Sequence, residues 1–477
     1  MDEGDFPHER SIPKHWLEEE QERALQDSNK PGRAPVPRGW SPPAWLNVIL
    51  LLIMVALISA LAYLRDEKPP WDGDLAVVPV VEEGADNAPE PLPDWADLRS
   101  PGRMKTLLRT AMKMNLGGQG EKPAWEWDTP LLAKVLEDNS ATLDNFSDLC
   151  DDDDDQWNPE NPAWKKEDLG SDPAWFKVLT LKQAEVAYLM RREQEEAAMR
   201  VALTLVKIAS RLEKLDAWPS FMHRALDMHK TGAQSLAILL QNTRLSELQL
   251  RRFQMEDFLQ WEPSGKSLAR SLNGFYQFEK KLIMGPQAGD VPLPPGYMPL
   301  RSGWLLFKPN GTLRLFAESF RELKDEAGLT QMARVNQIDS REHRHFSERR
   351  RGVSGPNASG EEYFLTRVQE YEEILNQHSF ARARYNIVMT LFAMRRYILK
   401  QGRIPKTLEE LVPDYMAATV KDPFNGEPLR YHAAQGVVYS VGSDLKDDGG
   451  HPTPFPLTDE SEPTARTGIF SAKSAKP

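Results

Sequence analysis

Three aspartates near the C-terminal end of the chain have the spacing needed to bind a hard cation. Asp444, Asp447 and Asp448 lie between Gly442 and two further glycines at 449–450. Carboxylate oxygens are preferred ligands of Ca²⁺, and glycines allow a short loop to fold around one ion. An acidic surface turn has the same composition. The loop therefore predicts either a calcium site, with Ca²⁺ as the cofactor, or a solvated turn.

Histidine and cysteine side chains form no recognisable catalytic motif. His223, His229 and His378 are available as acid–base groups, together with scattered carboxylates. None of them belongs to a nucleophile elbow, a P-loop, a zincin motif or a dinucleotide fingerprint. Cys150 is the only cysteine, so an intramolecular disulfide is excluded. The sequence thus identifies no catalytic residue, although a hydrolase that uses the histidines stays an alternative.

The overall charge argues against a nucleic-acid partner. The chain has 59 Lys and Arg against 71 Asp and Glu, which gives a formal net charge of −12 at pH 7. Proteins that bind nucleic acids present basic faces to the phosphate backbone, and an acidic chain of this kind does not predict one. We therefore expect proteins and a membrane as partners, and no nucleic acid.

An uninterrupted apolar run at residues 44–64 predicts a transmembrane helix. It contains no charged residue, and at about 1.5 Å per residue it matches the ~30 Å hydrocarbon core of a bilayer. The small-x-small pattern at 60–62 is also typical of a signal-peptide cleavage site, but the preceding tail is too long and too acidic for one. Lys30, Arg33 and Arg38 favour a cytoplasmic N-terminus. We expect a single-pass inner-membrane protein with its bulk outside the cytoplasm.

Composition and hydrophobic periodicity divide the chain into segments. The polar tail at 1–43 is expected to be disordered and cytoplasmic, and the proline-rich, acidic segment at 65–102 to be a linker. Apolar residues at helical spacing predict a helical domain at 103–286. The remaining expected segments are a linker and irregular helical region (287–360), a long helix with a small C-terminal module (361–450) and a disordered tail (451–477).

Local signals predict helix ends and a hairpin. Ser246 and Gln249 have the spacing of a capping box that opens a helix, as do Thr407 and Glu410. Gly402 is placed to end the long helix in a left-handed conformation. Two short strand-like runs, at 429–432 and 437–441, predict an antiparallel hairpin. The expected fold class is mainly α with a small α+β C-terminal module and a single-span membrane anchor.

The C-terminal region resembles the soluble half of the major pseudopilin of type II secretion systems. The resemblance rests on five short segments in order, at 402–405 (GRIP), 408–412 (LEELV), 421–426 (KDPFNG), 429–431 (LRY) and 439–444 (YSVGSD). In that family the final loop binds calcium, which implicates Asp444, Asp447 and Asp448. The chain departs from a pseudopilin because it lacks the prepilin-peptidase site and the glutamate that follows it. The chain also looks like membrane-anchored bacterial proteins with the same ending.

Together these features predict a non-catalytic, membrane-anchored protein of the cell envelope. Its helical body would be an interaction platform for protein partners, and its pseudopilin-like module would be stabilised by calcium. An extracytoplasmic hydrolase is one alternative. A glycan-binding protein is another, because sugars stack on aromatic faces and the helical domain is rich in tryptophan. The tryptophans concerned are Trp127, Trp157, Trp164 and Trp175.

Overall fold

The computed structural model describes most of the helical part of the chain. The described residues are 14–28, 44–76, 111, 113, 114, 116, 124–150, 172–213, 219–284, 307–334, 355–450, 457 and 463–466. Most of the predicted tails, of the 65–102 linker and of the 287–360 region lie outside them, as do Trp157 and Trp164. The chain forms two units, Met1–Arg65 and Asp66–Pro477.

The described residues of the first unit form two helices. The first, α1 (Lys14–Ser28), is rich in Glu, Gln, Leu and Ala, which are strong helix formers, and Arg23 pairs with Glu19 one turn away at 3.7 Å. The second, α2 (Ala44–Leu64), consists of the apolar run. Its large apolar side chains, such as Val48 and Leu52, are exposed.

The predicted membrane anchor requires a correction. Over the described part of the chain, no helix has both the length and the apolar character needed to cross a membrane. The single-span anchor at 44–64 is therefore wrong as a part of the fold class, which is otherwise mostly helical with three short strands.

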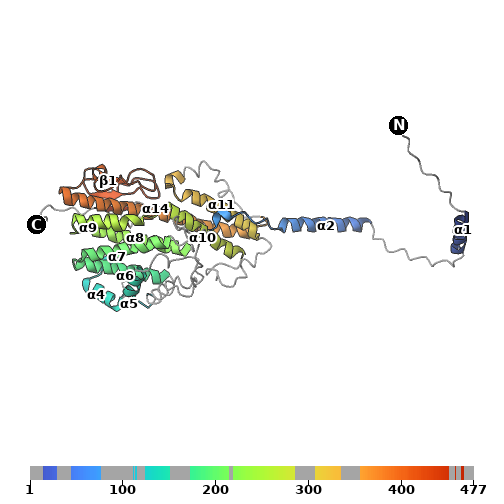
Figure 1. Ribbon diagram of the computed structural model, residues 1–477, viewed down its shortest axis with the longest axis horizontal. Coiled ribbons are helices and arrows are strands. Elements are labelled where there is room, and N and C mark those ends of the chain that lie inside the picture. The colour runs from blue at the N-terminus through green and yellow to red at the C-terminus, as the bar shows by residue number, and fades with distance from the viewer. Residues whose placement is uncertain are drawn as a thin grey trace, which may run out of the picture. The chain divides into compact units, whose positions relative to one another are not determined.

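The second unit is built from long helices that lie side by side, with the strands at one edge (Figure 1). Residues 172–213 form two helices and not one, because Glu193 adopts a left-handed conformation (φ 58°) between them. The long helices are α6 (Asp172–Arg191), α7 (Glu195–Glu213), α8 (Pro219–Asn242), α10 (Gly265–Met284), α11 (Pro309–Glu326) and α14 (Ala358–Gln401). Shorter helices are α4 (Thr129–Asp138), α5 (Ser140–Cys150), α9 (Glu247–Arg252), a π-helix (Phe253–Phe258) and 3₁₀ turns at Gly73–Leu75, Ala124–Glu126, Leu259–Trp261 and Leu408–Leu411.

Helix α14 connects the two ends of this unit. Its 44 residues extend about 66 Å, and it ends at Gly402, which has a φ of 71°, as predicted. Its N-terminal half packs with α10 and α11 through aromatic contacts, and the rings of Phe316 and Phe364 meet edge to face at 5.0 Å. Its C-terminal half packs against α8 and α9. One helix therefore contributes to two of the three large clusters of buried residues.

The C-terminal module contains a three-stranded antiparallel sheet in the order β1–β2–β3. The predicted hairpin is confirmed by β1 (Arg430–His432) and β2 (Val437–Tyr439), in which Tyr431 is paired with Val438. The third strand, β3 (Thr464–Arg466), was not predicted. It pairs with β2, and Ala465 is buried.

This module shares its core with the helical body. Val438 and Ala465 of the sheet belong to the same cluster of buried residues as Leu236 of α8, Val206 of α7 and Leu391 of α14. A strand that packs on a helix in this way loses its apolar contacts if the two separate. The sheet and the helices are therefore parts of one packed structure.

The two predicted capping boxes have different outcomes. In α9 the Ser246 hydroxyl accepts from the Gln249 amide at 3.3 Å, and Gln249 Oε1 accepts from the Ser246 amide at 3.0 Å, which confirms the first box. The second prediction is wrong, because residues 408–411 form a 3₁₀ turn without a capping hydrogen bond from the Thr407 side chain. Glu410 instead accepts a hydrogen bond from Tyr397 and pairs with Arg403 at 2.8 Å.

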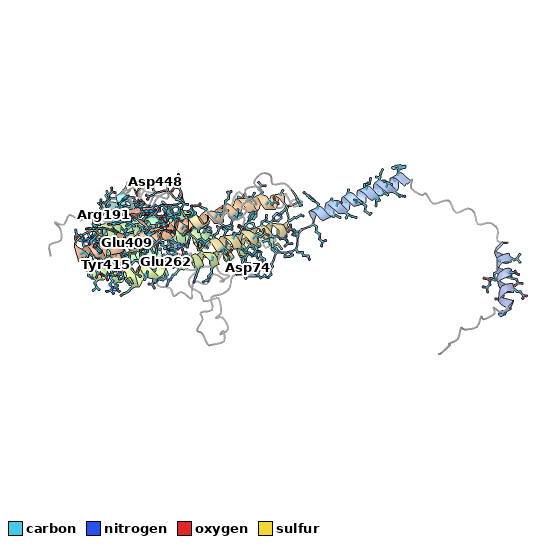
Figure 2. All side chains as sticks on the ribbon, turned by 90° about the horizontal axis from the view of Figure 1, so that it is seen from above. Asp74, Arg191, Glu262, Glu409, Tyr415 and Asp448 are labelled. Atoms are coloured by element: carbon cyan, nitrogen blue, oxygen red, sulfur yellow. The ribbon has the colours of Figure 1, made fainter. Side chains whose placement is uncertain are left out.

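The segment after α2 is fastened to the helical body from Asp66 onward. Asp66 accepts hydrogen bonds from the amides of Asn310 (3.0 Å) and Gly311 (3.3 Å) in the first turn of α11. A carboxylate at this position satisfies unpaired amides and complements the helix dipole. Asp74 pairs with Arg321 of α11 at 2.7 Å. Asp74 is labelled in Figure 2. Residues 66–76 thus lie along α10 and α11.

Candidate functional site

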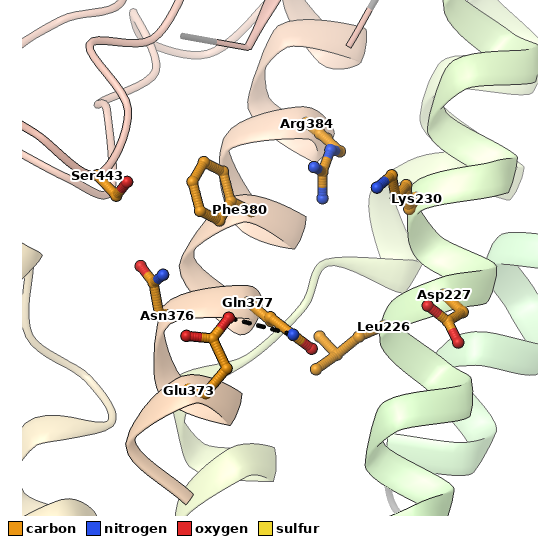
Figure 3. A pocket seen from close by; sticks show the side chains of 9 residues that line it. All are labelled: Leu226, Asp227, Lys230, Glu373, Asn376, Gln377, Phe380, Arg384 and Ser443. Atoms are coloured by element: carbon orange, nitrogen blue, oxygen red, sulfur yellow. Dashed lines mark hydrogen bonds between the residues drawn. The ribbon is translucent and has the colours of Figure 1, made fainter. Parts of the chain in front are cut away.

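A polar pocket lies where three parts of the protein meet. They are α8, α14 and the loop at 442–450 that carries Asp444, Asp447 and Asp448, which we call the aspartate loop. Its volume is about 300 Å³. Figure 3 shows its lining side chains, which come from α8 on one side and α14 on the other, with Ser443 of the loop nearby. The lining residues are Leu226, Asp227, Lys230, Glu373, Asn376, Gln377, Phe380, Arg384 and Ser443.

The pocket carries both signs of charge, and they are separated. Lys230 and Arg384 lie near each other at one end, whereas Asp227 and Glu373 lie toward the other (Figure 3). Burial raises the pKa of Asp227, and the nearby cations Arg224, His223 and Lys230 only partly oppose this effect. Charged groups in a partly enclosed site interact more strongly than they would in water.

Main-chain contacts hold the module side of the pocket in place. Gln331, just after α11, donates its side-chain amide to the Ser443 carbonyl at 2.7 Å. The next residue, Met332, donates its main-chain amide to the carbonyl of Phe424 at 2.8 Å. On α14, Asn386 donates to the Lys421 carbonyl at 2.7 Å. Three contacts from two elements thus fix the module beside α14.

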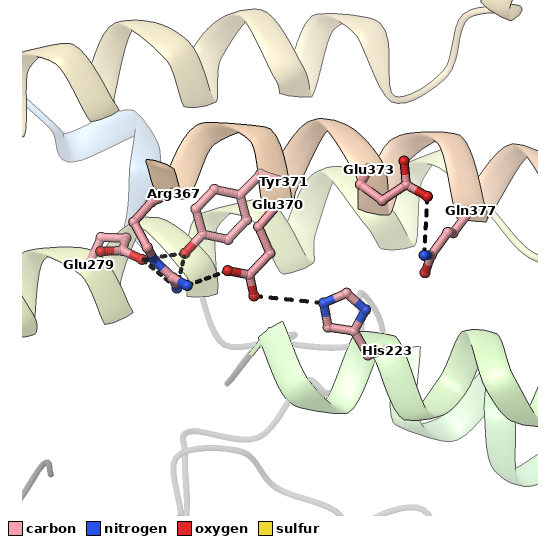
Figure 4. A network of polar contacts seen from close by, with 7 residues as sticks. All are labelled: His223, Glu279, Arg367, Glu370, Tyr371, Glu373 and Gln377. Atoms are coloured by element: carbon pink, nitrogen blue, oxygen red, sulfur yellow. Dashed lines mark hydrogen bonds and ion pairs between the residues drawn. The ribbon is translucent and has the colours of Figure 1, made fainter. Parts of the chain in front are cut away.

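A buried network continues along α14 from the pocket (Figure 4). Glu279 of α10 is fully buried and accepts from Arg367 at 2.7 Å and from the Tyr371 hydroxyl. Arg367 also pairs with Glu370. A buried carboxylate with several donors is well compensated for its loss of water. The network therefore holds α10 and α14 in register.

Glu370 links this network to α8. His223 approaches its carboxylate at 3.8 Å, in a half-buried setting (Figure 4). Burial acts to raise the pKa of Glu370, but His223 and Arg367 outweigh burial, so the pKa lies below its ordinary value. His223, the first of the three histidines considered as acid–base groups, therefore lies beside Glu370.

The other two histidines meet at a buried carboxylate. His229 Nε2 lies 3.2 Å from Glu213 Oε1, and His378 Nε2 lies 3.9 Å from the same oxygen. They come from three helices, α8, α7 and α14, and all three side chains are buried. Burial lowers the pKa of His378 to about 4, even though Glu213 acts in the opposite direction. Sequence patterns did not identify Glu213, because it comes near these histidines only through helix packing.

The three predicted metal ligands lie on the surface, where each has interactions of its own. Asp447 accepts from the Tyr439 hydroxyl at 3.1 Å and pairs with Arg430 at 3.5 Å. Asp444 accepts from the main-chain amide of Lys446 at 3.1 Å. Asp448 is exposed at the edge of the module (Figure 2). Among the described residues, no three His, Cys, Asp or Glu side chains form a group that could hold a metal ion. In this arrangement the loop does not gather its carboxylates around one point.

The carboxylate that organises the module is Asp422. It is 1% exposed and accepts hydrogen bonds from the Phe424 amide (3.0 Å), the Ser440 hydroxyl (2.9 Å) and the Val441 amide (2.9 Å). Burial raises its pKa, and these hydrogen bonds lower it only in part. Sequence patterns did not identify Asp422 as the link between its own turn and the residues that follow β2. An aspartate directly before Pro423 was the available signal, because such residues bond to their own turn.

The two tryptophans of the glycan-binding alternative that the structure describes are core residues. Trp127 is 2% exposed and Trp175 is 1% exposed. Both pack in the cluster formed by α4, α6 and α7. A sugar would not reach either ring on the folded surface.

Comparison of the chain with models of protein families, with curated proteins and with solved structures found no match.

Proposed function

We propose that the protein is a non-catalytic binding protein of the bacterial cell envelope. Its helical body and its pseudopilin-like module form one platform for protein partners outside the cytoplasm. The envelope location rests on the resemblance of residues 402–444 to the major pseudopilin.

The observation that carries this proposal is the single core shared by helices and sheet. Leu391 of α14, Leu236 of α8 and Val438 of β2 lie in one buried cluster. The side chain of Gln254, in the π-helix, donates to the Tyr415 carbonyl at 3.2 Å and accepts from Arg396 at 2.8 Å, both inside this core. Surfaces held together in this way are preorganised, and preorganisation reduces the entropy lost on binding.

The alternative of a hydrolase meets a physical obstacle. Its best acid–base group is the cluster of Glu213, His229 and His378, which is at most 4% exposed. A general base has to come within hydrogen-bond reach of its substrate. Access would require α7, α8 and α14 to separate, and these helices contain much of the core. The geometry therefore favours binding.

Affinity capture from envelope extracts tests the proposal. The full chain is the bait, and it is compared with an Asp422→Ala variant, which removes the acceptor that holds the module together. Asp414→Asn, an exposed change in the same module, is the matched control. We expect one defined set of proteins to bind the wild type and the control, and to bind Asp422→Ala less strongly in step with the loss of its helix signal in circular dichroism, because helices and sheet share one core. Capture that is the same for all three baits, or hydrolysis that is lost in His378→Gln, would overturn the proposal.

A further inference from the structure

We infer that the face of α10 and α11 covered by residues 66–76 is a docking site for an acidic segment of a protein partner. Residues 66–76, which we call the strap, occupy this face from within the chain and have to leave it before the partner binds. The strap and both helices belong to one unit of the structure. The inference deepens the proposed function, and it rests on that function in taking the partner to be a protein.

Side chains of the two helices donate hydrogen bonds to main-chain carbonyls of the strap. The donors on α10 are Gln277 and Asn273, and those on α11 are Arg321 and Lys324. The pairs of donor and carbonyl are Gln277–Leu75 (2.8 Å), Asn273–Ala76 (3.2 Å), Arg321–Trp71 (2.6 Å) and Lys324–Asp74 (3.0 Å). Every peptide carries such carbonyls, so the same four donors are suited to a segment of another protein.

Two carboxylates of the strap have bonding partners on the helices. Asp72 accepts hydrogen bonds from Lys280 at 2.6 Å and from the Tyr276 hydroxyl at 2.8 Å. Asp74 accepts from two nitrogens of Arg321, at 2.7 Å and 2.9 Å, in the bidentate geometry typical of guanidinium and carboxylate. These contacts select two acidic residues separated by one position. The docking face therefore consists of Asn273, Tyr276, Gln277, Lys280, Arg321 and Lys324.

Leu75 anchors the strap in the core. Its side chain is fully buried in the cluster that contains Phe316 and Phe320 of α11. By contrast, Trp71 and Asp74 of the strap are exposed. Buried apolar anchors of this kind supply much of the binding energy of an interface. A leucine directly after the second acidic residue therefore completes the required pattern, Asp-x-Asp-Leu.

The strap can leave while the two helices stay in place. α10 and α11 contact each other directly, and the rings of Tyr276 and Phe320 meet edge to face at 6.0 Å. The side chains of Asp74 and Arg321 are 33% and 34% exposed, and ion pairs open to solvent contribute little to stability. A segment held by one buried side chain and such contacts opens at a lower free energy than core helices do. We therefore expect the docking face to persist when the strap is released.

The charge of the docking face favours an acidic protein other than a second copy. Lys280, Arg321 and Lys324 contribute three cations, and complementary charge favours docking of an acidic segment. A second copy brings the same segment, but that strap already makes these contacts in its own chain at a high effective concentration. Exchange between copies therefore gains no contact, whereas a partner with a higher affinity for the face displaces the strap.

Fluorescence anisotropy with a labelled peptide tests the inference on the full chain. The peptide Pro-Trp-Asp-Gly-Asp-Leu-Ala copies residues 70–76, and the tethered strap competes with it for the face. Asp74→Asn removes one carboxylate of the strap, so this variant should bind the peptide about tenfold more tightly than the wild type. Leu75→Ala, which removes the anchor, should act in the same direction. A peptide with Asn in place of both Asp should bind Asp74→Asn at least about tenfold more weakly.

Variants of the helices decide whether the docking face is the site. In the Asp74→Asn chain, Arg321→Gln should weaken peptide binding about tenfold, because the peptide's second carboxylate loses its bidentate partner. Arg251→Gln on α9 and Asp325→Asn on α11 are exposed matched controls that should leave binding unchanged.

Three results would overturn the inference. One is the absence of peptide binding to Asp74→Asn at millimolar concentration, and another is equal binding with and without Arg321→Gln. The third is a wild-type dimer, seen by sedimentation, that is lost in Arg321→Gln, because the occupant would then be a second copy. Capture of partners that depends on Asp422 is measured separately, so failure here is distinguishable from failure of the proposed function.

Discussion

The side-chain amide of Gln331 donates a hydrogen bond to the carbonyl oxygen of Ser443 across 2.7 Å. Gln331 follows α11, and Ser443 belongs to the loop that carries the three predicted calcium ligands. This contact lies at the rim of the pocket, and it joins segments more than a hundred positions apart in the chain. The loop is therefore positioned by the helical body as well as by its own sheet.

Replacement of Asp422 should destabilise the protein strongly. Asp422→Ala leaves the Val441 amide, the Phe424 amide and the Ser440 hydroxyl without their acceptor in a buried site. We expect a loss of about 3 kcal/mol in the free energy of unfolding, because hydrogen bonds to a charged acceptor are the strong ones. Urea unfolding measures it, with Asp414→Asn as the exposed control. A loss similar to that of the control would contradict the assigned role.

Local signals were sufficient to predict several elements. The bounds of the apolar helix at 44–64, the end of α14 at Gly402, the capping box at Ser246 and the β1–β2 hairpin all follow from short-range chemistry. In each case the deciding interaction is made by residues close in the chain. A predicted element agrees with the structure where no distant residue competes for its side chains.

Long-range packing explains what sequence analysis missed. The capping box at Thr407 fails because Tyr397 and Arg403 engage Glu410. β3 was missed because its three residues have no strand pattern of their own and gain their partners only from β2. The pocket combines α8 and α14, which meet through helix packing that a hydrophobic stripe does not specify. Similarly, Glu213 reaches His229 and His378 only in the folded protein.

The buried histidine should make stability depend on pH in acid. The pKa of His378 is about 4 in the folded protein, against an ordinary value of 6.5, because burial disfavours its charged form. Glu213 opposes this effect, and the charges of Arg382, His229 and Arg334 reinforce it. A depressed histidine pKa means that the unfolded chain binds the proton more readily. Stability from this group is therefore complete above pH 6.5 and falls as the pH decreases toward 4.

The size of this effect is measurable by urea unfolding at several pH values. Between pH 7 and pH 4 the wild type should lose about 3 kcal/mol more stability than His378→Gln, from 1.36 kcal/mol for each pKa unit. His432→Gln, an exposed change, should keep the wild-type slope. If the free energy of unfolding changed with pH equally in the wild type and in His378→Gln, the pKa of His378 would not be lowered in the folded protein.

Removal of the Glu279 carboxylate should lower the free energy of unfolding strongly. Glu279→Ala leaves Arg367 and Tyr371 buried without their shared carboxylate. Removal of one partner from a buried ion pair typically costs 3–5 kcal/mol, so we expect a loss of about that size. Tyr363→Phe, which removes one hydrogen bond to the same glutamate, should cost only about 1 kcal/mol. Thermal unfolding compares the two, and similar losses would contradict the central place of Glu279.

Calcium binding by the aspartate loop stays a prediction, and the structure gives it a sharper test. An ion at Asp447 would compete with Arg430, which pairs with this carboxylate at 3.5 Å. We therefore expect any increase of melting temperature in millimolar calcium to be larger in Arg430→Gln than in the wild type and absent in Asp447→Ala. Lys406→Gln is an exposed control for the lost positive charge. No difference between calcium and chelator in Arg430→Gln would leave the loop as an acidic surface turn.

The most direct test of the account is whether the helical body and the module open together. Native-state hydrogen exchange in increasing urea can follow the amides of β2, at 437–439, and those of α8, at 225–240, in the same sample. Because Val438 and Leu236 share one core, the account predicts that both sets open with the same free energy and the same dependence on urea. Exchange of the β2 amides at distinctly lower urea, with α8 still protected, would contradict a single rigid platform.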